Sequence, residues 1–253
     1  MTFASPNREF RRFAWKDTNV RIHARSDLEA WHELVRQRRQ LEAYLAGDTL
    51  FKTALKPVSL QPNAPEVAQR MHAASVRTGV GPMAAVAGTL AQFAAEEASR
   101  IAGGDVIVEN GGDLFVKVER PVRVGLFTGA GRLGGRLAFL VQPCISPVAV
   151  CSSSSRMGHS VSFGACDLAT VVAPDAALAD AAATLLCNSV RSRADLEVAL
   201  ERVVGIPGIR GALAVVGEAL GIKGNLPKLV PGASADTTRK ITRDPRAGLM
   251  SAR

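Results

Sequence analysis

Apolar residues recur at helical spacing in several long segments of the chain. Over residues 27–45 they stand three or four positions apart, which places one apolar face against a core and leaves the intervening arginines in solvent. Ser26 and Glu29 precede this face with the spacing of a capping box, so we expect the helix to begin there. Similar patterns predict helices over residues 65–77, 83–100, 176–190 and 194–204.

The helix predicted over residues 83–100 has almost no side chains in its first half. Ala84 and Gly88, with the alanines between and after them, leave its surface flat. A flat surface of this kind lets a neighbouring backbone or a planar ligand approach closely. The sequence alone does not decide between a neighbouring backbone and a ligand.

Alternating apolar and polar residues predict strands between and after these helices. Residues 105–119 form two alternating runs joined by Asn110-Gly111-Gly112, the strongest short hairpin signal in the chain. Further strands are expected over residues 19–24, 122–127, 136–141, 148–151 and 168–172, with a last hairpin over residues 211–223. Helices first, then hairpin-linked strands, then helices again favour an α+β fold with antiparallel sheets over a doubly wound α/β sheet.

Length and composition set the boundaries of this fold. The 253 residues suffice for a single domain with a large buried core, which we place at residues 16–227. We expect residues 1–15 to be flexible, and residues 228–253 to be a disordered basic tail rich in Pro, Gly, Ser, Thr and Arg. No run reaches the roughly 18 apolar residues of a membrane span, and the start of the chain lacks a signal-peptide pattern, so we expect a cytoplasmic protein without a membrane partner.

Charge is distributed unevenly along the chain. The formal net charge is +8, yet the stretch from Val141 to Val190 holds one Arg and three Asp. The basic segments elsewhere lack the interleaved aromatic residues of single-strand binders, which argues against nucleic acid as a partner. The four cysteines match no zinc-binding spacing, and in a reducing compartment we expect most of them to be small buried residues.

The nearly charge-free stretch from Val150 to Asn188 concentrates candidate chemistry. It begins with a run of serine hydroxyls followed by a glycine and a histidine, which we interpret as a polar loop at a ligand site. Asp180 and Thr184 then lie four apart in an apolar helix, so their oxygens share one face, a spacing suited to a hard cation such as Mg²⁺. A buried Asp is also satisfied by a neighbouring backbone or hydroxyl group, so the spacing alone leaves both interpretations open. Asp175, at the start of this helix, is expected to be its N-cap.

Four motifs resemble a known family. ENGGDLFV at residues 109–116, the small-residue helix at 81–93, GHSVSFG at 158–164 and ADAAAT at 179–184 recur in the same order in a short cytoplasmic branch of the ApbE-like superfamily. The resemblance covers most of the chain. It implies the fold of the superfamily, a single T-fold-like α+β domain in which antiparallel sheets pack against helices.

The better-known members of that superfamily are FAD-dependent transferases that attach FMN to proteins. In those enzymes the ADAxAT-type helix supplies Mg²⁺ ligands, so the resemblance implies a metal site at Asp180 and Thr184. It also implies flavin or nucleotide contacts at the turn, in the polar loop and along the small-residue helix, namely Gly111, Gly112, Asp113, Ser152, Ser153, Ser154, Gly158, Ala84 and Gly88.

Two departures from the transferase pattern limit the function that the resemblance implies. The run Ala87-Gly88-Thr89 lacks the lysine that transferases commonly carry there, and residues 159–164 lack their Asp-Pro-Arg segment. We therefore expect binding of FAD, FMN or another nucleotide-like phosphate ligand with Mg²⁺. The departures argue against transfer of FMN to an external protein, while the resemblance keeps a transferase of ApbE-like type open.

His159 and Cys151 are the candidate catalytic residues. His159 follows a glycine in the polar loop and could act as a general base, although a loop histidine bonded to backbone is an equal alternative. Cys151 could form a reactive thiolate if His159 lay beside it; the alternative is a buried, inert cysteine.

Two rival functions follow from the resemblance. The branch has been associated with sulfur assimilation, which suggests a sulfur-transfer enzyme or subunit in homocysteine synthesis that uses Cys151 and a protein partner. The other rival is a noncatalytic binding protein that keeps a degenerate cleft. The sequence leaves the oligomeric state open, a homo-oligomer included.

Overall fold

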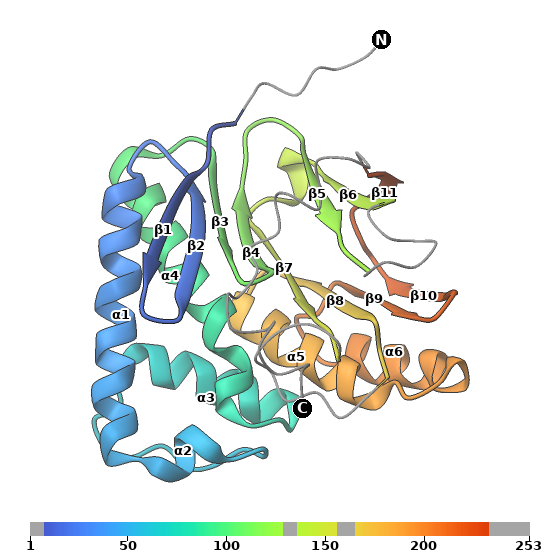
Figure 1. Cartoon of the computed structure of the whole chain (residues 1–253), viewed down its shortest axis with the longest axis horizontal. Helices are drawn as coiled ribbons and strands as arrows, with labels where there is room; N and C mark the ends of the chain where they lie inside the picture. Colours follow the sequence, from blue (N-terminus) through green and yellow to red (C-terminus); the bar gives the residue numbers. More distant parts are fainter. Residues whose placement is uncertain (1–7, 129–135, 156–164, 233–253) are drawn as a thin grey trace, which may run out of the picture.

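A computed structural model describes residues 8–128, 136–155 and 165–232 of the chain. Within these ranges the chain forms two antiparallel sheets and a layer of helices (Figure 1). The α+β class predicted from the order of elements is confirmed. No helix within the described ranges is both long and apolar enough to cross a membrane.

The large sheet has eight strands in the order β1-β2-β3-β4-β7-β8-β9-β10, and each neighbouring pair is antiparallel. Its strands are β1 (Arg11–Trp15), β2 (Thr18–His23), β3 (Val106–Asn110), β4 (Asp113–Lys117), β7 (Val148–Ser153), β8 (Leu168–Ala173), β9 (Gly211–Val216) and β10 (Ala219–Gly224). The sequence leaves the sheet after β4 and returns at β7, which makes β4 and β7 neighbours.

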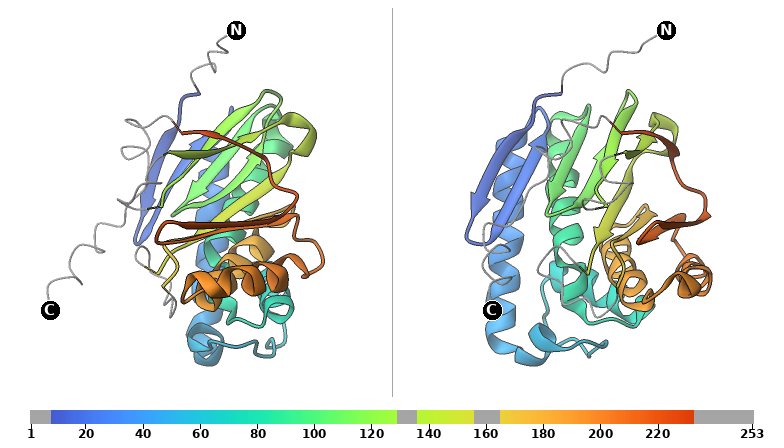
Figure 2. Two further views of the ribbon diagram at one scale, coloured as in Figure 1. Left: turned by 90° about the vertical axis from the view of Figure 1, so that its right-hand side faces the viewer. Right: turned by 45° about the vertical axis from the view of Figure 1, so that its right-hand side comes forward.

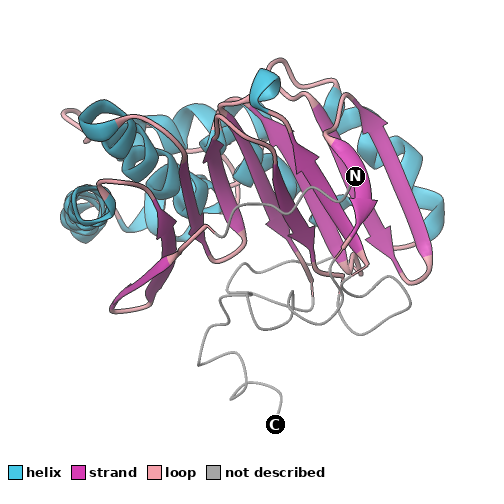
Figure 3. Ribbon diagram, turned by 90° about the horizontal axis from the view of Figure 1, so that it is seen from above, coloured by secondary structure: helices cyan, strands magenta, loops and turns pink. Residues whose placement is uncertain are grey.

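Helices cover one face of this sheet (Figure 3). Helix α5 packs on β7 and β8, α4 packs on β3 and β4, and α6 packs on β9 and β10. The helical elements are α1 (Asp27–Gly47), α2 (Thr49–Thr53), α3 (Glu66–Thr78), η1 (Pro82–Ala85), α4 (Val86–Ala102), η2 (Pro143–Ile145), α5 (Ala176–Ser189), η3 (Arg193–Asp195) and α6 (Leu196–Val204).

A small three-stranded sheet lies against part of the opposite face. It has the order β11-β6-β5 and consists of β5 (Val122–Leu126), β6 (Leu137–Val141) and β11 (Lys228–Pro231). Phe139 and Val141 of β6 join Val148, Val150 and other residues of the large sheet in one apolar cluster. The large sheet therefore separates two cores, one facing the helices and one facing the small sheet.

The β3–β4 hairpin forms as the sequence predicts. Asn110 pairs with Asp113, so Gly111 and Gly112 make a two-residue turn. Their φ angles are 65° and 110°, which non-glycine residues rarely adopt. The turn places Asp113 at the first position of β4.

The structure differs from the sequence-based expectations at both ends of the domain. Arg11–Trp15 form strand β1 although residues 1–15 were expected to be flexible, and Lys228–Pro231 form strand β11 although the tail was expected to begin at 228. In both cases pairing with a neighbouring strand supplies the order that the local composition does not.

Two helix starts also differ from expectation. The Ser26 side chain does not cap α1, because its hydroxyl donates to the carbonyl of Ala98 at 3.1 Å. The helix predicted over residues 83–100 is divided into the 3₁₀ turn η1 and the α-helix α4. Asp175 does cap α5, accepting from the amide of Leu178.

Candidate functional site

Asp113 lies where the β3–β4 hairpin meets the helical layer. Because side chains alternate along β4, Asp113 shares the helix-facing side with Phe115, which is part of the core beneath the helices. The backbone amide of Ser152 on β7 donates to Asp113 Oδ1 at 3.2 Å. The carboxylate is buried between β4, β7 and the helices.

Asp180 reaches the same region from helix α5. The amide of Gly88, near the start of α4, donates to Asp180 Oδ2 at 2.9 Å. The amide of Ala87 lies on the same side and lowers the pKa of this carboxyl group. Asp180 is 8% exposed, so the carboxylate is held between two helices and largely shielded from water.

Burial perturbs the protonation of both carboxyl groups. The pKa of Asp113 is raised to about 7; loss of hydration is the largest cause, and the charge of Glu109 contributes in the same direction. Burial also raises the pKa of Asp180 well above its ordinary value, with the charge of Asp113 as the next cause. Backbone amides oppose these shifts at both residues, but no lysine or arginine of the described chain does so. The two groups form a buried acidic pair without a basic partner.

Thr184 lies one helical turn beyond Asp180 and is 7% exposed. Other helical threonines, Thr53, Thr78 and Thr89, donate their hydroxyls to the carbonyl of the residue four positions earlier in the chain. Thr184 makes no such bond, and its hydroxyl has no hydrogen-bond partner within the described ranges. Its oxygen is therefore available beside the acidic pair.

Comparisons with known proteins agree with this architecture. A family model described as AbpE bacteria matches residues 3–204. The UPF0280 protein of Methanosarcina barkeri is 40% identical over 221 residues, which cover 86% of this chain and 87% of the relative. The chain belongs to the ApbE-like superfamily.

Solved structures share the fold of this ApbE-like protein at low sequence identity. The flavinyl transferase ApbE of Pseudomonas stutzeri in its apo form has a TM-score of 0.57 and 13% identity, covering 90% of this chain and 96% of its own. The ApbE protein of Thermotoga maritima has a TM-score of 0.55 and 13% identity, covering 93% and 100%. The expected ApbE-like fold is confirmed.

The glycine of the small-residue helix contacts α5 in this ApbE-like protein. A Cβ atom at Gly88 would lie 2.5 Å from the carbonyl oxygen of Ala176 and 2.9 Å from Cβ of Asp180. The neighbouring backbone, and not a planar ligand, fills the space that the missing side chain leaves. Ala84, expected on the same helical surface, lies in the preceding 3₁₀ turn η1.

The serine segment is not the continuous loop that the sequence suggested. Ser152 and Ser153 are the last residues of β7, and Ser154 and Ser155 follow the strand. Ser152 faces the small-sheet side, opposite to Cys151, and its Oγ lies 2.9 Å from Oγ1 of Thr170. Ser153 and Ser154 are buried. Gly158 and His159 lie outside the described residues, so their predicted roles stay predictions.

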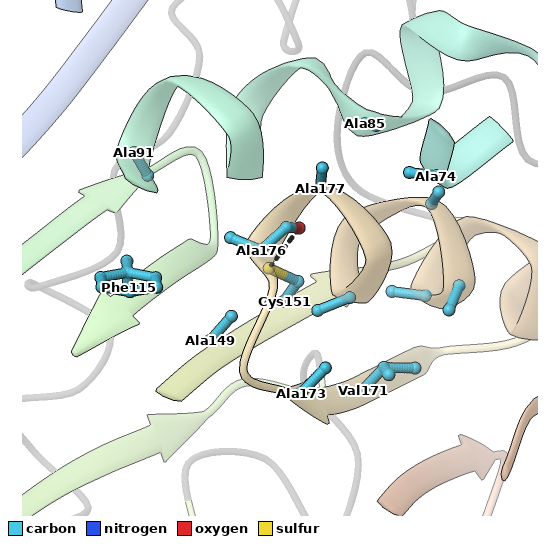
Figure 4. Close-up of a cluster of buried hydrophobic side chains, with 14 of the residues drawn as sticks. Ala74, Ala85, Ala91, Phe115, Ala149, Cys151, Val171, Ala173, Ala176 and Ala177 are labelled. Carbon is cyan, nitrogen blue, oxygen red and sulfur yellow. Dashed lines mark hydrogen bonds between the residues drawn. The ribbon is translucent and has the colours of Figure 1, made fainter. Parts of the chain in front are cut away.

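Cys151 lies in the core between β7 and the start of α5 (Figure 4). It is fully buried, and its thiol donates to the carbonyl of Ala176 over 3.7 Å. Burial raises the pKa of the thiol well above its ordinary value, and the negative charges of Asp113 and Asp180 raise it further. This environment opposes a thiolate, so the expected nucleophile has the properties of an inert core cysteine.

The sequence does not specify the contacts that position the site. Asn110 donates from Nδ2 to the carbonyl of Ala87 at 3.1 Å, which ties the hairpin to the start of α4. Glu109 pairs with Arg21 of β2 on the opposite face of the sheet. The alternation of β3 signals these directions, but the partners come from distant segments that no local pattern specifies.

The side chains of this site could offer a cation oxygen ligands. Within the described residues no three His, Cys, Asp or Glu side chains gather closely enough to hold a metal ion. The acidic pair and the Thr184 hydroxyl therefore suit a hard cation that completes its shell with water or ligand oxygens, as Mg²⁺ does, and do not suit Zn²⁺.

Proposed function

We propose that this protein binds a flavin nucleotide, or a related nucleotide-like phosphate compound, together with Mg²⁺ at the site formed by Asp113, Asp180 and Thr184. The observation that carries the proposal is the buried acidic pair without a basic partner. Two carboxylates in such surroundings resist ionisation together, and a divalent cation relieves both the desolvation and their mutual repulsion.

The donor set of the site fits this cation. Asp180 is held by the backbone amide of Gly88 in α4, and Thr184 presents an oxygen one turn away on the same helix. Mg²⁺ is commonly held by one or two carboxylates, and phosphate oxygens and water complete its six ligands. When bound, the cation would offset the negative charge of the phosphates.

The glycine turn supports the nucleotide part of the proposal. Gly111 is exposed, and a Cβ atom there would meet nothing within 4 Å, so the backbone of the turn is open to a ligand. Exposed glycine amides are common donors to phosphate and carbonyl oxygens. The P. stutzeri relative is named a flavinyl transferase, which makes a flavin the first ligand to test.

The proposal is limited to binding. Ala87-Gly88-Thr89 lacks the lysine of the transferase pattern, so transfer of FMN to another protein is not part of it. A sulfur-transfer function is not proposed, since the buried Cys151 thiol opposes ionisation. Location in the cytoplasm and a homo-oligomeric state remain predictions of the sequence.

FAD fluorescence titration of the chelator-stripped protein, with and without Mg²⁺, tests the proposal. We expect saturable binding that Mg²⁺ strengthens, and we expect Asp180→Asn and Thr184→Val to weaken Mg²⁺-dependent binding at least about tenfold, the effect of about 1.4 kcal/mol. Thr53→Val is the matched control, because Thr53 is an exposed helical threonine bonded to its own helix.

Two results would count against the proposal. Binding that is equal with and without Mg²⁺ would remove the cation from the site. Unchanged binding by an Asp180→Asn variant that retains its circular dichroism spectrum would place the ligand elsewhere.

A further inference from the structure

A second concave surface lies far from the acidic pair, between strand β1 and helix α1. This cavity of about 590 Å³ is lined by Ala14 and Trp15 of β1 and by two adjacent rows of α1, which include Trp31, Val35, Arg36 and Arg39. We refer to it as the tryptophan groove. It shares no residue with the proposed nucleotide site.

The floor of the groove is aromatic. Both tryptophans of the chain line it. Phe13 stacks on Trp31, with ring centroids 5.3 Å apart and an angle of 17° between the planes. Half-buried indole rings of this kind are typical anchors for a bound chain, because each offers a large rigid apolar surface.

The rim of the groove is basic. The ammonium of Lys16 lies 4.4 Å and the guanidinium of Arg39 lies 5.6 Å from the Trp15 ring. Lys16 is paired with Glu42 and Arg36 with Glu33, whereas Arg39 has no carboxylate partner within the described ranges. Arg12 of β1 likewise has none there. The surplus of positive charge favours an acidic occupant.

Strand β1 is an edge of the large sheet, and α1 runs beside it (Figure 2). Within the described ranges β1 pairs only with β2. Trp15 and Thr18 close a two-residue hairpin turn, so hydrogen-bonded pairs recur at every second residue from Trp15. The backbone N–H and C=O groups of Arg12 and Ala14 therefore point outward, where an added strand would bind them.

We propose that the tryptophan groove binds an extended acidic segment of a partner protein, which adds to the edge of β1. Alternate side chains of an added strand point to opposite faces, so its apolar residues would contact Trp15, Trp31 and Val35 on the side of α1, while its carboxylates would lie near Arg12 on the other side. A second copy of this chain fits less well, because β1 carries Arg11 and Arg12 and no acidic residue, so two copies of this edge would add positive charge to positive charge.

Intrinsic tryptophan fluorescence tests this proposal, because both tryptophans line the groove. The probe is a short blocked peptide that alternates glutamate with valine and phenylalanine, titrated into the full-length protein. We expect a saturable shift of the emission. Ala14→Pro removes an outward N–H without removing a β1–β2 hydrogen bond, and Arg12→Glu reverses the charge expected beside the carboxylates; each is expected to weaken binding about tenfold.

Matched controls separate recognition from misfolding. Ala14→Val keeps the outward N–H and is expected to bind the peptide like the parent chain. A peptide with lysine in place of glutamate is expected not to bind. Size-exclusion chromatography with light scattering accompanies each variant.

Three results would overturn the proposal. The first is an unchanged emission at saturating glutamate peptide. The second is equal binding of the lysine peptide, or equal binding by Ala14→Pro. The third is a concentration-dependent dimer that Ala14→Pro abolishes, which would identify a second copy as the occupant. An oligonucleotide that binds in place of the peptide, with no effect of Ala14→Pro, would likewise overturn it.

Discussion

The two regions that carry the proposals treat ionised side chains in opposite ways. Around β1, β2 and α1 the acidic side chains lie near the surface, and four of them stand within 4 Å of a basic group, namely Asp17, Asp27, Glu33 and Glu42. Between β4, α4 and α5 the carboxyl groups of Asp113 and Asp180 are buried, and backbone amides are their main donors.

This difference shows that charge density alone does not locate function. Several ion pairs lie in the basic N-terminal region of the described chain, but exposed pairs of this kind contribute little to stability. In the described part of the central region the carboxyl groups of Asp113 and Asp180 are buried, and burial raises the pKa of both; the proposed cation site depends on this. The absence of a basic partner is the more informative signal.

Substitution of Gly88 should have the largest effect on stability, and this effect should arise in the central region alone. A Cβ atom in Gly88→Ala would collide with the Ala176 carbonyl and with Asp180, so the α4–α5 contact must open. We expect a loss of about 1–3 kcal/mol in the free energy of unfolding, measured by urea denaturation, together with weaker FAD binding.

Gly47→Ala is the matched control for this substitution. Gly47 is the last residue of α1, and a Cβ atom there meets nothing within 4 Å. We expect its stability to be unchanged or slightly raised. Equal destabilisation by both variants would mean that the close α4–α5 contact is not the cause.

The second largest effect is expected in the pH dependence of stability, which should be stronger for the central region than for the N-terminal region. The folded protein keeps a proton on Asp113 up to about pH 7, whereas the unfolded chain releases it near the ordinary pKa of 3.8. Unfolding therefore releases protons in this window, and the contribution of Asp113 to stability falls as pH rises from about 4 to about 7.

Asp113→Asn removes this contribution. In the parent chain this contribution makes the free energy of unfolding fall by about 1 kcal/mol per pH unit in that window. We expect the fall to be absent from the variant when urea denaturation is measured across pH. Asp17→Asn, at an exposed and paired carboxylate, should leave the slope almost unchanged. A parent chain with the same slope as Asp113→Asn would show that Asp113 titrates at its ordinary pKa.

The smallest effect is expected in the N-terminal region. Lys16 and Glu42 are 2.6 Å apart, but their side chains are 54% and 31% exposed. A double-mutant cycle of Lys16→Gln and Glu42→Gln should give a coupling free energy of less than about 1 kcal/mol, and added salt should lower it. A larger coupling free energy would contradict the view that the exposed ion pairs of the N-terminal region contribute little to stability.

Much of the fold could be predicted because local patterns decide it. The periodicity of α1, the Asp175 cap of α5 and the glycine turn between β3 and β4 each depend on neighbouring residues. Strand β1 was missed because Arg11 and Arg12 are a poor local signal for a strand, and only pairing with β2 orders them. The capping role of Ser26 failed for a related reason, since Ala98, far along the chain, binds its hydroxyl.

The site was predictable only in parts. The motifs identified Asp113 and Asp180, but assigned one to a nucleotide contact and the other to a metal. Their electrostatic coupling depends on the order of strands, because β7 and not β5 pairs with β4 and supplies the Ser152 amide. The direction of Ser152, opposite to Cys151, likewise follows from the register of β7 with β8. No local pattern specifies such pairings.

The acidic pair also has a practical use. Asp113 belongs to the sheet and Asp180 to a helix, and the charge of the first raises the pKa of the second. The strength of this coupling depends on the distance between the two layers. The pKa of Asp180, measured from carboxyl resonances in NMR spectra, would therefore report without any label whether a ligand brings the helix and the sheet closer together or moves them apart.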